Sequence, residues 1–282
     1  MMSLKEVVDA AADFFQDSEV PSPRLNAELL LMFVLGCDRS YLFAHPEQLL
    51  KPEEDARYRE VVRERAGGCP TQYITGHQEF WGLDLLVSPS VLIPRPETEH
   101  VVETTLELVR LRDPEAPLRM IDIGTGSGCL ALAFAKELPK AEIHACDISE
   151  PALEMAGINA ARLRLERVQF KKSDLLSAYP AEHFDFVISN PPYVGEMEAD
   201  KVQKQVKDFE PRIAVFSGME GLDIYKRLIP QAEEAVSSGG WLVMEIGFST
   251  EAKVKALLTG WEEVITTADL QGIPRVVAAR KA

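Results

Sequence analysis

The sequence has few of the features that mark secreted, membrane-bound or metal-binding proteins. Its 282 residues include four cysteines, which lie far apart and form no CxxC pair, so neither a disulfide framework nor a zinc site is indicated. Its five histidines are equally scattered. No apolar run approaches the length of a membrane span, and the first residues lack the apolar core of a signal peptide. We therefore expect a cytoplasmic protein that needs no metal.

Positive charge is also scarce. The chain has 30 lysines and arginines against 45 aspartates and glutamates, which gives a formal net charge of −15. Nucleic-acid affinity comes largely from neutralising phosphates with lysine and arginine. One locally basic stretch, residues 162–172, is typical of a solvated helix end followed by the start of a strand. We therefore do not expect a nucleic-acid or membrane partner.

The second half of the chain alternates strand-like and helix-like segments. The expected strands are residues 118–123, 141–147, 168–171, 184–189, 241–246, 261–267 and 275–279, and the expected helices are residues 128–138, 151–163, 222–236 and 250–258. Such alternation predicts an α/β fold with a mostly parallel sheet and right-handed crossovers. We place this large domain at residues 97–282.

Residues 1–70 predict a small helical domain. Ser3 and Glu6 fit a capping box at the start of a first helix, and Pro23 and Gly36 fit the two ends of a second. The second helix carries an apolar side of Leu25, Leu29, Met32 and Phe33, and further helices are expected near residues 38–44 and 52–67. No catalytic set of residues occurs here, so substrate recognition or packing is the expected role.

Residues 71–96 predict a β-hairpin linker between the two domains. We place its turn at Ser88-Pro89-Ser90, after the apolar run 83–87. Arg95 follows between two prolines; such an arginine is usually a surface residue, but the stiff backbone leaves a positioned role open. A charged segment at residues 194–217 interrupts the strand–helix alternation and predicts a flap over the site.

A glycine-rich loop, Asp122-Ile123-Gly124-Thr125-Gly126-Ser127-Gly128, joins the first expected strand of the large domain to its helix. Small residues let the backbone approach a ligand, and the helix N-terminus offers free N–H groups. No Gly-Lys-Ser/Thr follows, which excludes a P-loop, and Cys129 stands where a dinucleotide fingerprint has its third glycine. The spacing suits S-adenosylmethionine, with the N–H groups on its carboxylate and Asp122 near its cationic end.

Acidic residues follow the next two strands. Asp147 ends the second strand, where a carboxylate accepts from ribose hydroxyls in nucleotide-binding folds; as an isolated feature it would equally be a helix cap. Asp174 and Leu175 follow the third strand, where Asp174 could accept from the adenine amino group and Leu175 could cover its face. The order of these features on successive strands favours one nucleotide-like cofactor.

The fourth strand is followed by the tetrapeptide Asn190-Pro191-Pro192-Tyr193. Two prolines cannot continue a strand, so the chain turns at the sheet edge where α/β proteins bind ligands. The Asn190 side-chain oxygen and the Pro191 carbonyl could accept both hydrogens of a planar NH2 group, and Tyr193 could pack against its flat face. A carboxamide or a base amine is thus the expected acceptor.

Together, the glycine loop and Asn190-Pro191-Pro192-Tyr193 resemble the Rossmann-like amino-methyltransferases. The segment Val91-Leu92-Ile93-Pro94-Arg95-Pro96-Glu97-Thr98-Glu99 narrows the resemblance to the HemK/PrmC family, the release factor glutamine N5-methyltransferases. Further matches are Gly76 to Phe80, Phe209-Glu210-Pro211-Arg212, Gly221 to Tyr225, Glu245-Ile246-Gly247 and Asp269 to Arg275, so the resemblance covers essentially the whole chain. Ser249-Thr250 departs from the family pattern, which often has a glutamine there.

The resemblance implies a fold, a cofactor and a substrate. It implies a seven-stranded, mostly parallel sheet and methyl transfer from S-adenosylmethionine, leaving S-adenosylhomocysteine. The acceptor is the glutamine of the Gly-Gly-Gln motif in class-I peptide chain release factors. Matched residue by residue, the family's motifs imply that Gly124–Gly128, Asp147, Leu175 and Asn190 bind the cofactor. They imply that residues 190–193 bind the substrate glutamine, and Arg95 is a further candidate for substrate binding.

Three alternatives remain open to test. An adenine-N6 methyltransferase would use Asn-Pro-Pro-Tyr in the same way, to accept from an NH2 group. It would also need a basic groove or a target-recognition domain, and the net charge of −15 disfavours this alternative. A non-catalytic binding module would be marked by a degraded glycine loop or by loss of Asn190, and neither is seen. A heme-pathway oxidoreductase lacks a flavin or dinucleotide fingerprint.

Overall fold

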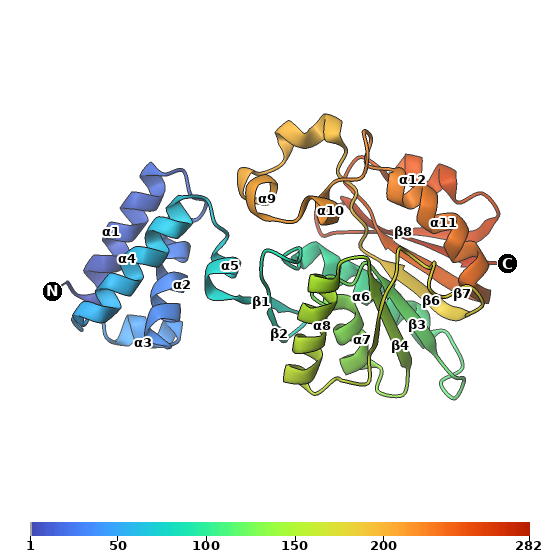
Figure 1. Ribbon diagram of the computed structural model, residues 1–282, viewed down its shortest axis with the longest axis horizontal. Coiled ribbons are helices and arrows are strands. Elements are labelled where there is room, and N and C mark those ends of the chain that lie inside the picture. Colours follow the sequence, from blue (N-terminus) through green and yellow to red (C-terminus); the bar gives the residue numbers. More distant parts are fainter. Residues whose placement is uncertain (1) are drawn as a thin grey trace. The chain divides into compact units, whose positions relative to one another are not determined.

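The computed structural model describes residues 2–282, which divide into two compact units. The first comprises residues 2–77 with Lys204–Phe209, and the second comprises Gln78–Gln203 with Glu210–Ala282 (Figure 1). Within residues 2–282, none of the helices combines the length and the apolar character that crossing a bilayer requires. No group of three or more His, Cys, Asp or Glu in that range is arranged to hold a metal ion.

The first unit is helical, as its sequence predicts. Its helices are α1 (Leu4–Asp17), α2 (Pro23–Leu35), α3 (Arg39–Ala44), α4 (Pro52–Ala66), α5 (Thr71–Thr75) and α9 (Lys204–Phe209). The capping box forms at α1, where Ser3 and Glu6 bond each other's backbone N–H groups. Gly36 ends α2 with a φ of 63°, a left-handed conformation that favours glycine.

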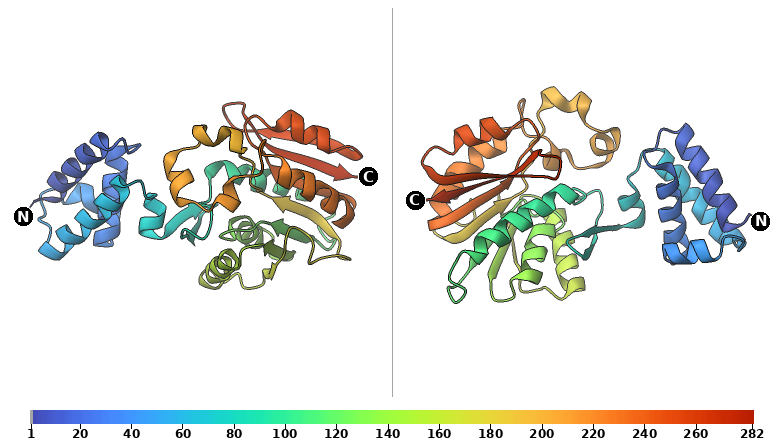
Figure 2. Two further views of the ribbon diagram at one scale, coloured as in Figure 1. Left: turned by 45° about the horizontal axis from the view of Figure 1, so that its top comes forward. Right: turned by 180° about the vertical axis from the view of Figure 1, so that it is seen from behind.

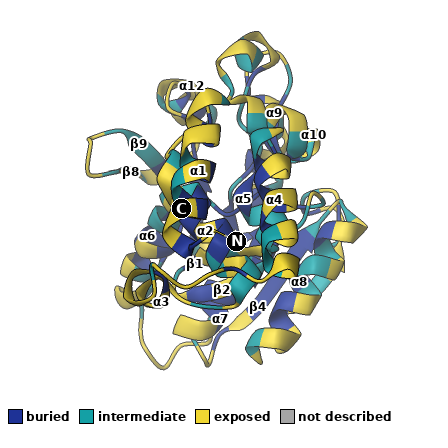
Figure 3. Cartoon of the chain, turned by 90° about the vertical axis from the view of Figure 1, so that its left-hand side faces the viewer, coloured by how far each residue is buried: buried dark blue, intermediate teal, exposed yellow. Residues whose placement is uncertain are grey.

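The apolar side expected for α2 only partly coincides with the side that packs. Of its four residues, Met32 is partly buried against the helical core, whereas Leu25, Leu29 and Phe33 are 45%, 38% and 38% exposed. The core also takes Ala27, Leu30 and Leu31 from the same helix. The reason is that α2 lies against both α1 and α4, so its buried surface is set by two neighbours rather than by one apolar stripe. Figure 3 shows the outward sides of α1 and α4 in yellow, the colour of exposed residues.

The second unit is built on a seven-stranded sheet, which confirms the expected fold class. Its strands are β3 (Arg119–Ile123), β4 (Glu142–Asp147), β5 (Gln169–Lys172), β6 (Phe184–Ser189), β7 (Val236–Glu245), β8 (Trp261–Ala268) and β9 (Pro274–Lys281). The order across the sheet is β5-β4-β3-β6-β7-β9-β8. Pairings among the first five are parallel, and β9 is antiparallel to both β7 and β8.

Helices cover both faces of this sheet, which is why its strands are near-continuous apolar runs. Met120, Phe186 and Val243 pack in one cluster with α6 (Glu99–Arg110), α7 (Cys129–Glu137) and α8 (Glu150–Leu163). The alternate strand residues, such as Ile121 and Val187, pack in a second cluster with α11 (Asp223–Ala235) and α12 (Glu251–Leu257). The left view of Figure 2 shows the strands between these two layers.

The hairpin turn expected at residues 88–90 is wrong. The two strands are β1 (His77–Phe80) and β2 (Leu83–Leu86), so Trp81 and Gly82 form the turn, with φ values of 53° and 63°. The backbone N–H of Trp81 donates to Glu99 at 2.8 Å and its indole donates to Glu137 at 3.0 Å. These contacts with distant residues hold a tryptophan in a conformation that it rarely adopts.

The charged segment at 194–217 carries local structure of its own. It contains two short 3-10 or α-helical turns, η2 (Glu196–Lys201) and α10 (Arg212–Val215), besides α9. Another 3-10 turn, η1 (Pro96–Thr98), lies at the end of the stiff proline segment and directly precedes α6. Both α10 and η1 contribute to the site described next.

Candidate active site

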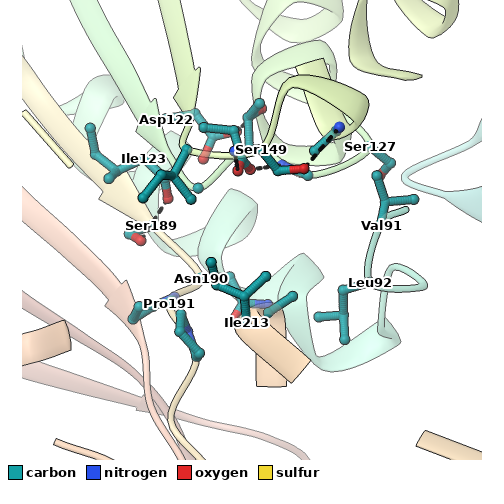
Figure 4. A pocket seen from close by; sticks show the side chains of 18 of the residues that line it. Val91, Leu92, Asp122, Ile123, Ser127, Ser149, Ser189, Asn190, Pro191 and Ile213 are labelled. Atoms are coloured by element: carbon teal, nitrogen blue, oxygen red, sulfur yellow. Dashed lines mark hydrogen bonds between the residues drawn. The ribbon is translucent and has the colours of Figure 1, made fainter. Parts of the chain in front are cut away.

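A cavity of about 280 Å³ lies at the carboxyl ends of β3, β4 and β6. After β3, the chain adds β4 and β5 on one side of it, and then adds β6 and β7 on the other side. The cavity therefore lies at the topological switch point, where open α/β sheets bind ligands. Figure 4 shows part of the lining. The labelled side chains come from the ends of β3 and β6, the loops after β3, β4 and β6, the segment before η1, and α10. The expected residues Asp122, Gly124–Ser127, Asp147, Asp174, Leu175 and Asn190–Pro192 line it, and Gly128 does not.

The glycines of the loop have two different tasks. A Cβ placed on Gly124 or Gly126 would meet no protein atom within 4 Å, and both residues have positive φ. A Cβ on Gly128 would lie 3.1 Å from Leu132 and 3.2 Å from Ala156, which belong to α7 and α8. The first two glycines therefore keep space open at the cavity, and the third permits close packing of two helices.

Asp122 is a buried carboxylate at the end of β3. Its Oδ2 accepts from the Thr125 hydroxyl at 2.6 Å and from the Ala131 N–H at 3.3 Å. Its Oδ1 has no hydrogen-bond partner within residues 2–282. Burial raises the pKa of Asp122 to about 7, and the two hydrogen bonds offset part of that rise. A cation at Oδ1 would stabilise the ionised form.

Asp147 and Asp174 differ in how they are held. The two oxygens of Asp147 accept from the N–H groups of Gly126 and Ser149, each at 2.9 Å, so the carboxylate is fixed in place. Burial raises the pKa of Asp147 above its usual range. Asp174 instead forms an exposed ion pair with Arg227 at 2.6 Å, and both of these side chains line the cavity.

Asn190, Pro191 and Pro192 line the cavity, but Tyr193 is not among the lining residues. The Asn190 NH2 group donates to the Thr98 hydroxyl at 3.0 Å. Tyr193 packs against the second core cluster, and its hydroxyl donates to Glu245 at 3.1 Å. The neighbouring Glu245 carboxylate and burial raise the pKa of Tyr193 well above its usual range.

Arg95 is likewise not among the lining residues. Its guanidinium pairs with Glu210, which precedes α10. Thr98 and Glu245, which the sequence analysis named only as parts of family-matching segments and not as site residues, instead bond to the tetrapeptide. The signal for Glu245 was available, because it is an acidic residue at the end of a buried strand; Thr98 gave no such signal.

The strand order and the loop after β3 define the class as the Rossmann-like methyltransferases. Solved structures share the fold: the hMettl16 catalytic domain in complex with a MAT2A 3'UTR hairpin is 21% identical with a TM-score of 0.57, covering 77% of this chain and 81% of that one. A methyltransferase from Pyrococcus furiosus is 16% identical with a TM-score of 0.51, covering 81% and 99%.

Sequence comparison narrows the class. Residues 6–76 match the family described as PrmC N-terminal domain, and residues 103–208 match the methyltransferase small domain. A release factor glutamine methyltransferase of Koribacter versatilis is 55% identical over 99% of both chains, and that of Coxiella burnetii is 39% identical over 100% of both. The chain therefore belongs to the release factor glutamine methyltransferase family, and it is an enzyme.

Proposed function

We propose that this enzyme transfers a methyl group from S-adenosylmethionine to N5, the side-chain amide nitrogen, of the glutamine in the Gly-Gly-Gln motif of class-I peptide chain release factors. The proposal rests on the position and the hydrogen bond of Asn190, which lines the cavity. Its NH2 group is held by Thr98, so its carbonyl oxygen remains to accept from an NH2 group of the substrate. The names of the relatives support the same substrate.

The hydrogen-bond donors and acceptors that line the cavity fit S-adenosylmethionine. The unpartnered Oδ1 of Asp122 offers an anionic acceptor for the cationic end of the cofactor. The N–H groups of Gly124 and Thr125 already donate to the Cys146 carbonyl, as that of Gly126 does to Asp147. We therefore assign the carboxylate of the cofactor to the N–H groups farther along, where α7 begins.

The ribose and the adenine of the cofactor are assigned to the residues at the ends of β4 and β5. Asp147 is held by two N–H groups, and the remaining lone pairs of its oxygens suit two hydroxyl donors. Leu175 lines the same cavity and offers an apolar face for the base. Asp174 could accept from the adenine amino group with Oδ1 while Oδ2 stays paired with Arg227.

The reaction depends on positioning. An amide nitrogen is a poor nucleophile because its lone pair is delocalised into the carbonyl. We assign Asn190 Oδ1 and the Pro191 carbonyl to accept from the substrate NH2 group, which draws electron density onto nitrogen and aligns it for transfer. When bound, the cofactor supplies the electrophilic methyl group. No base is needed in the transition state, because the N–H becomes acidic after the transfer.

The helical residues 1–70 are proposed to recognise the substrate protein. Leu25, Leu29 and Phe33 lie four residues apart on α2, so they form one exposed apolar stripe. Such a stripe suits an apolar patch on a partner. The formal charge of −15 suits a basic, RNA-associated protein as that partner.

The test is methyl transfer from labelled S-adenosylmethionine to a purified release factor. We expect label on the factor with Gly-Gly-Gln and none on the matched factor with Gly-Gly-Ala. The same assay with adenine-containing DNA and RNA tests the alternative acceptor. Label on nucleic acid, with none on either release factor, would overturn the proposal.

A further inference from the structure

Asn159 is a polar side chain of α8 that is 0% exposed. Its Oδ1 accepts from the Leu86 N–H at 2.7 Å, and its NH2 group donates to the carbonyls of Leu86 and Ser127, each at 2.9 Å. Both hydrogens of the NH2 group are therefore used, and the reversed carboxamide would set this group against the Leu86 N–H. One buried side chain joins the end of β2 to the glycine loop.

The Ser127 carbonyl belongs to a peptide group that is held at both ends. The N–H of this group, on Gly128, donates to the Thr125 carbonyl at 2.8 Å. Asn159 reaches the carbonyl because α8 lies close to the loop at Gly128, where an added Cβ would be 3.2 Å from Ala156. Ser127 also lines the cavity, and the α7 N–H groups that we assign to the cofactor carboxylate follow directly. Asn159 therefore fixes the end of the loop that approaches the cofactor.

The Leu86 contact fixes a further part of the cavity lining. Asn159 bonds both backbone groups of Leu86, as a neighbouring strand would. A turn closed by the Val91 N–H on the Ser88 carbonyl, at 3.1 Å, then leads the chain to residues 90–92, which line the cavity. The same side chain thus holds the glycine loop and the strand from which this second segment starts.

We propose that Asn159 is a positioning residue that couples the glycine loop to β2, so that cofactor binding at the loop also fixes residues 90–92. The inference rests on the proposed function, which places S-adenosylmethionine at the loop. In Figure 4, Val91 and Leu92 lie on the same side of the cavity as Ser127. Such coupling is reciprocal: detachment of Asn159 weakens cofactor binding, and bound cofactor disfavours that detachment by the same factor.

The first test measures cofactor affinity. Asn159→Leu removes all three hydrogen bonds, so the Kd of S-adenosylhomocysteine, measured by calorimetry, should rise by about 10-fold, the effect of leaving one buried group unpaired. Thr104→Val is the matched control for lost stability, because Thr104 is 3% exposed and donates to Thr267 at 2.9 Å, away from the cavity. Its Kd should stay within about 2-fold of the wild-type value. An unchanged Kd in Asn159→Leu, or an equal rise in Thr104→Val, overturns the inference.

Arg162→Ala separates the loop contact from the strand contact. Arg162 lies three residues after Asn159 on α8, and its guanidinium donates to the carbonyl and the carboxylate of Asp84 in β2. The variant removes an exposed attachment of β2 and leaves the bond to Ser127, so Kd should rise by about 2-fold at most. A rise equal to that of Asn159→Leu would assign the effect to the attachment of β2 alone and would overturn the inference.

The second test reads the coupling in the wild type, without a variant and without activity. Saturating S-adenosylhomocysteine should slow hydrogen exchange of the Leu86 N–H by about 10-fold, the factor expected for the change in Kd. The control is the Leu111 N–H, which donates to the Leu108 carbonyl at 3.2 Å at the end of α6 and should exchange at an unchanged rate. An unchanged Leu86 rate with the ligand bound overturns the inference.

Calorimetry on the wild type keeps this inference apart from the proposed function. Absence of S-adenosylhomocysteine binding would overturn the cofactor assignment and this inference together. Binding without methyl transfer to the Gly-Gly-Gln factor would overturn the proposed acceptor alone, since the Kd values and the Leu86 exchange rate still decide the role of Asn159.

Discussion

The guanidinium of Arg95 lies 2.5 Å from Oε1 of Glu210, whose side chain is 1% exposed. Oε2 of the same carboxylate accepts from the backbone N–H of Ile93 at 3.2 Å. One buried carboxylate thus joins the proline segment before α6 to the chain that enters α10. Since α10 carries Ile213 to the cavity, this ion pair helps to shape the site.

Removing Arg95 should therefore cost stability. Arg95→Ala leaves the Glu210 carboxylate buried without its partner, and we expect a loss of roughly 3 kcal/mol in the free energy of unfolding. Urea denaturation measures it, with Arg57→Ala as the control, since the Arg57–Glu60 pair is exposed and is worth well under about 1 kcal/mol. Unchanged stability with a raised KM for the release factor would show instead that Arg95 contacts the substrate.

Asn190→Ala should separate catalysis from cofactor binding. The substitution removes the acceptor for the substrate NH2 group, so we expect kcat to fall by about 10² to 10³. The Kd for S-adenosylmethionine, measured by calorimetry, should change by a factor of about 3 or less, since the other cofactor contacts remain. Gln231→Ala, which removes the acceptor of the Leu176 backbone N–H, is a control outside the cavity. Equal losses in kcat and in affinity would contradict the assigned role.

Asp147→Asn should show the opposite pattern. The carboxylate accepts from Gly126 and Ser149 with its two oxygens, and an asparagine must set its NH2 group against one of those N–H donors. We expect cofactor affinity to fall by about 10- to 100-fold, because the asparagine NH2 group cannot accept from a ribose hydroxyl, with kcat near normal at saturation. Asp174→Asn is the companion variant, because Asp174 is exposed and paired with Arg227. A loss confined to Asp174→Asn would reverse the two assignments.

The stability of the cofactor-free protein should depend on the charge of Asp122. Folding raises the pKa of Asp122 from 3.8 to about 7, because of burial, so the folded state binds the proton more tightly than the unfolded state. This contribution is fully present below pH 4 and is lost as pH rises through about 7. Glu245, whose pKa burial raises to about 7, acts in the same direction.

Asp122→Asn tests this dependence. Asparagine can keep both hydrogen bonds with its carbonyl oxygen, and its NH2 group replaces the unpartnered Oδ1. We expect the variant to be more stable than the wild type at pH 8 and to lose about 1.4 kcal/mol less per pH unit between pH 5 and 7. Urea unfolding at several pH values measures both. Identical slopes in the two proteins would contradict the raised pKa.

Much of the fold followed from local patterns. The strand of residues 184–189 was predictable because an apolar run ended by two prolines has few other solutions, and β6 has those bounds. The turn at Trp81-Gly82 was not predictable, because contacts with Glu99 and Glu137 hold it. Which residues of α2 are buried was not predictable from one apolar stripe, because α2 contacts both α1 and α4.

By itself, the sequence determined the α/β fold, the glycine loop and the placing of Asp147 and Asn190 at strand ends. These features depend on hydrophobic period, glycine and proline, which act over a few residues. The tertiary structure decided that Asn190 bonds Thr98, 92 residues away, and that Tyr193 bonds Glu245, 52 residues away. Such partners are chosen by the strand order, which brings distant segments to one sheet edge, and no local pattern encodes that choice.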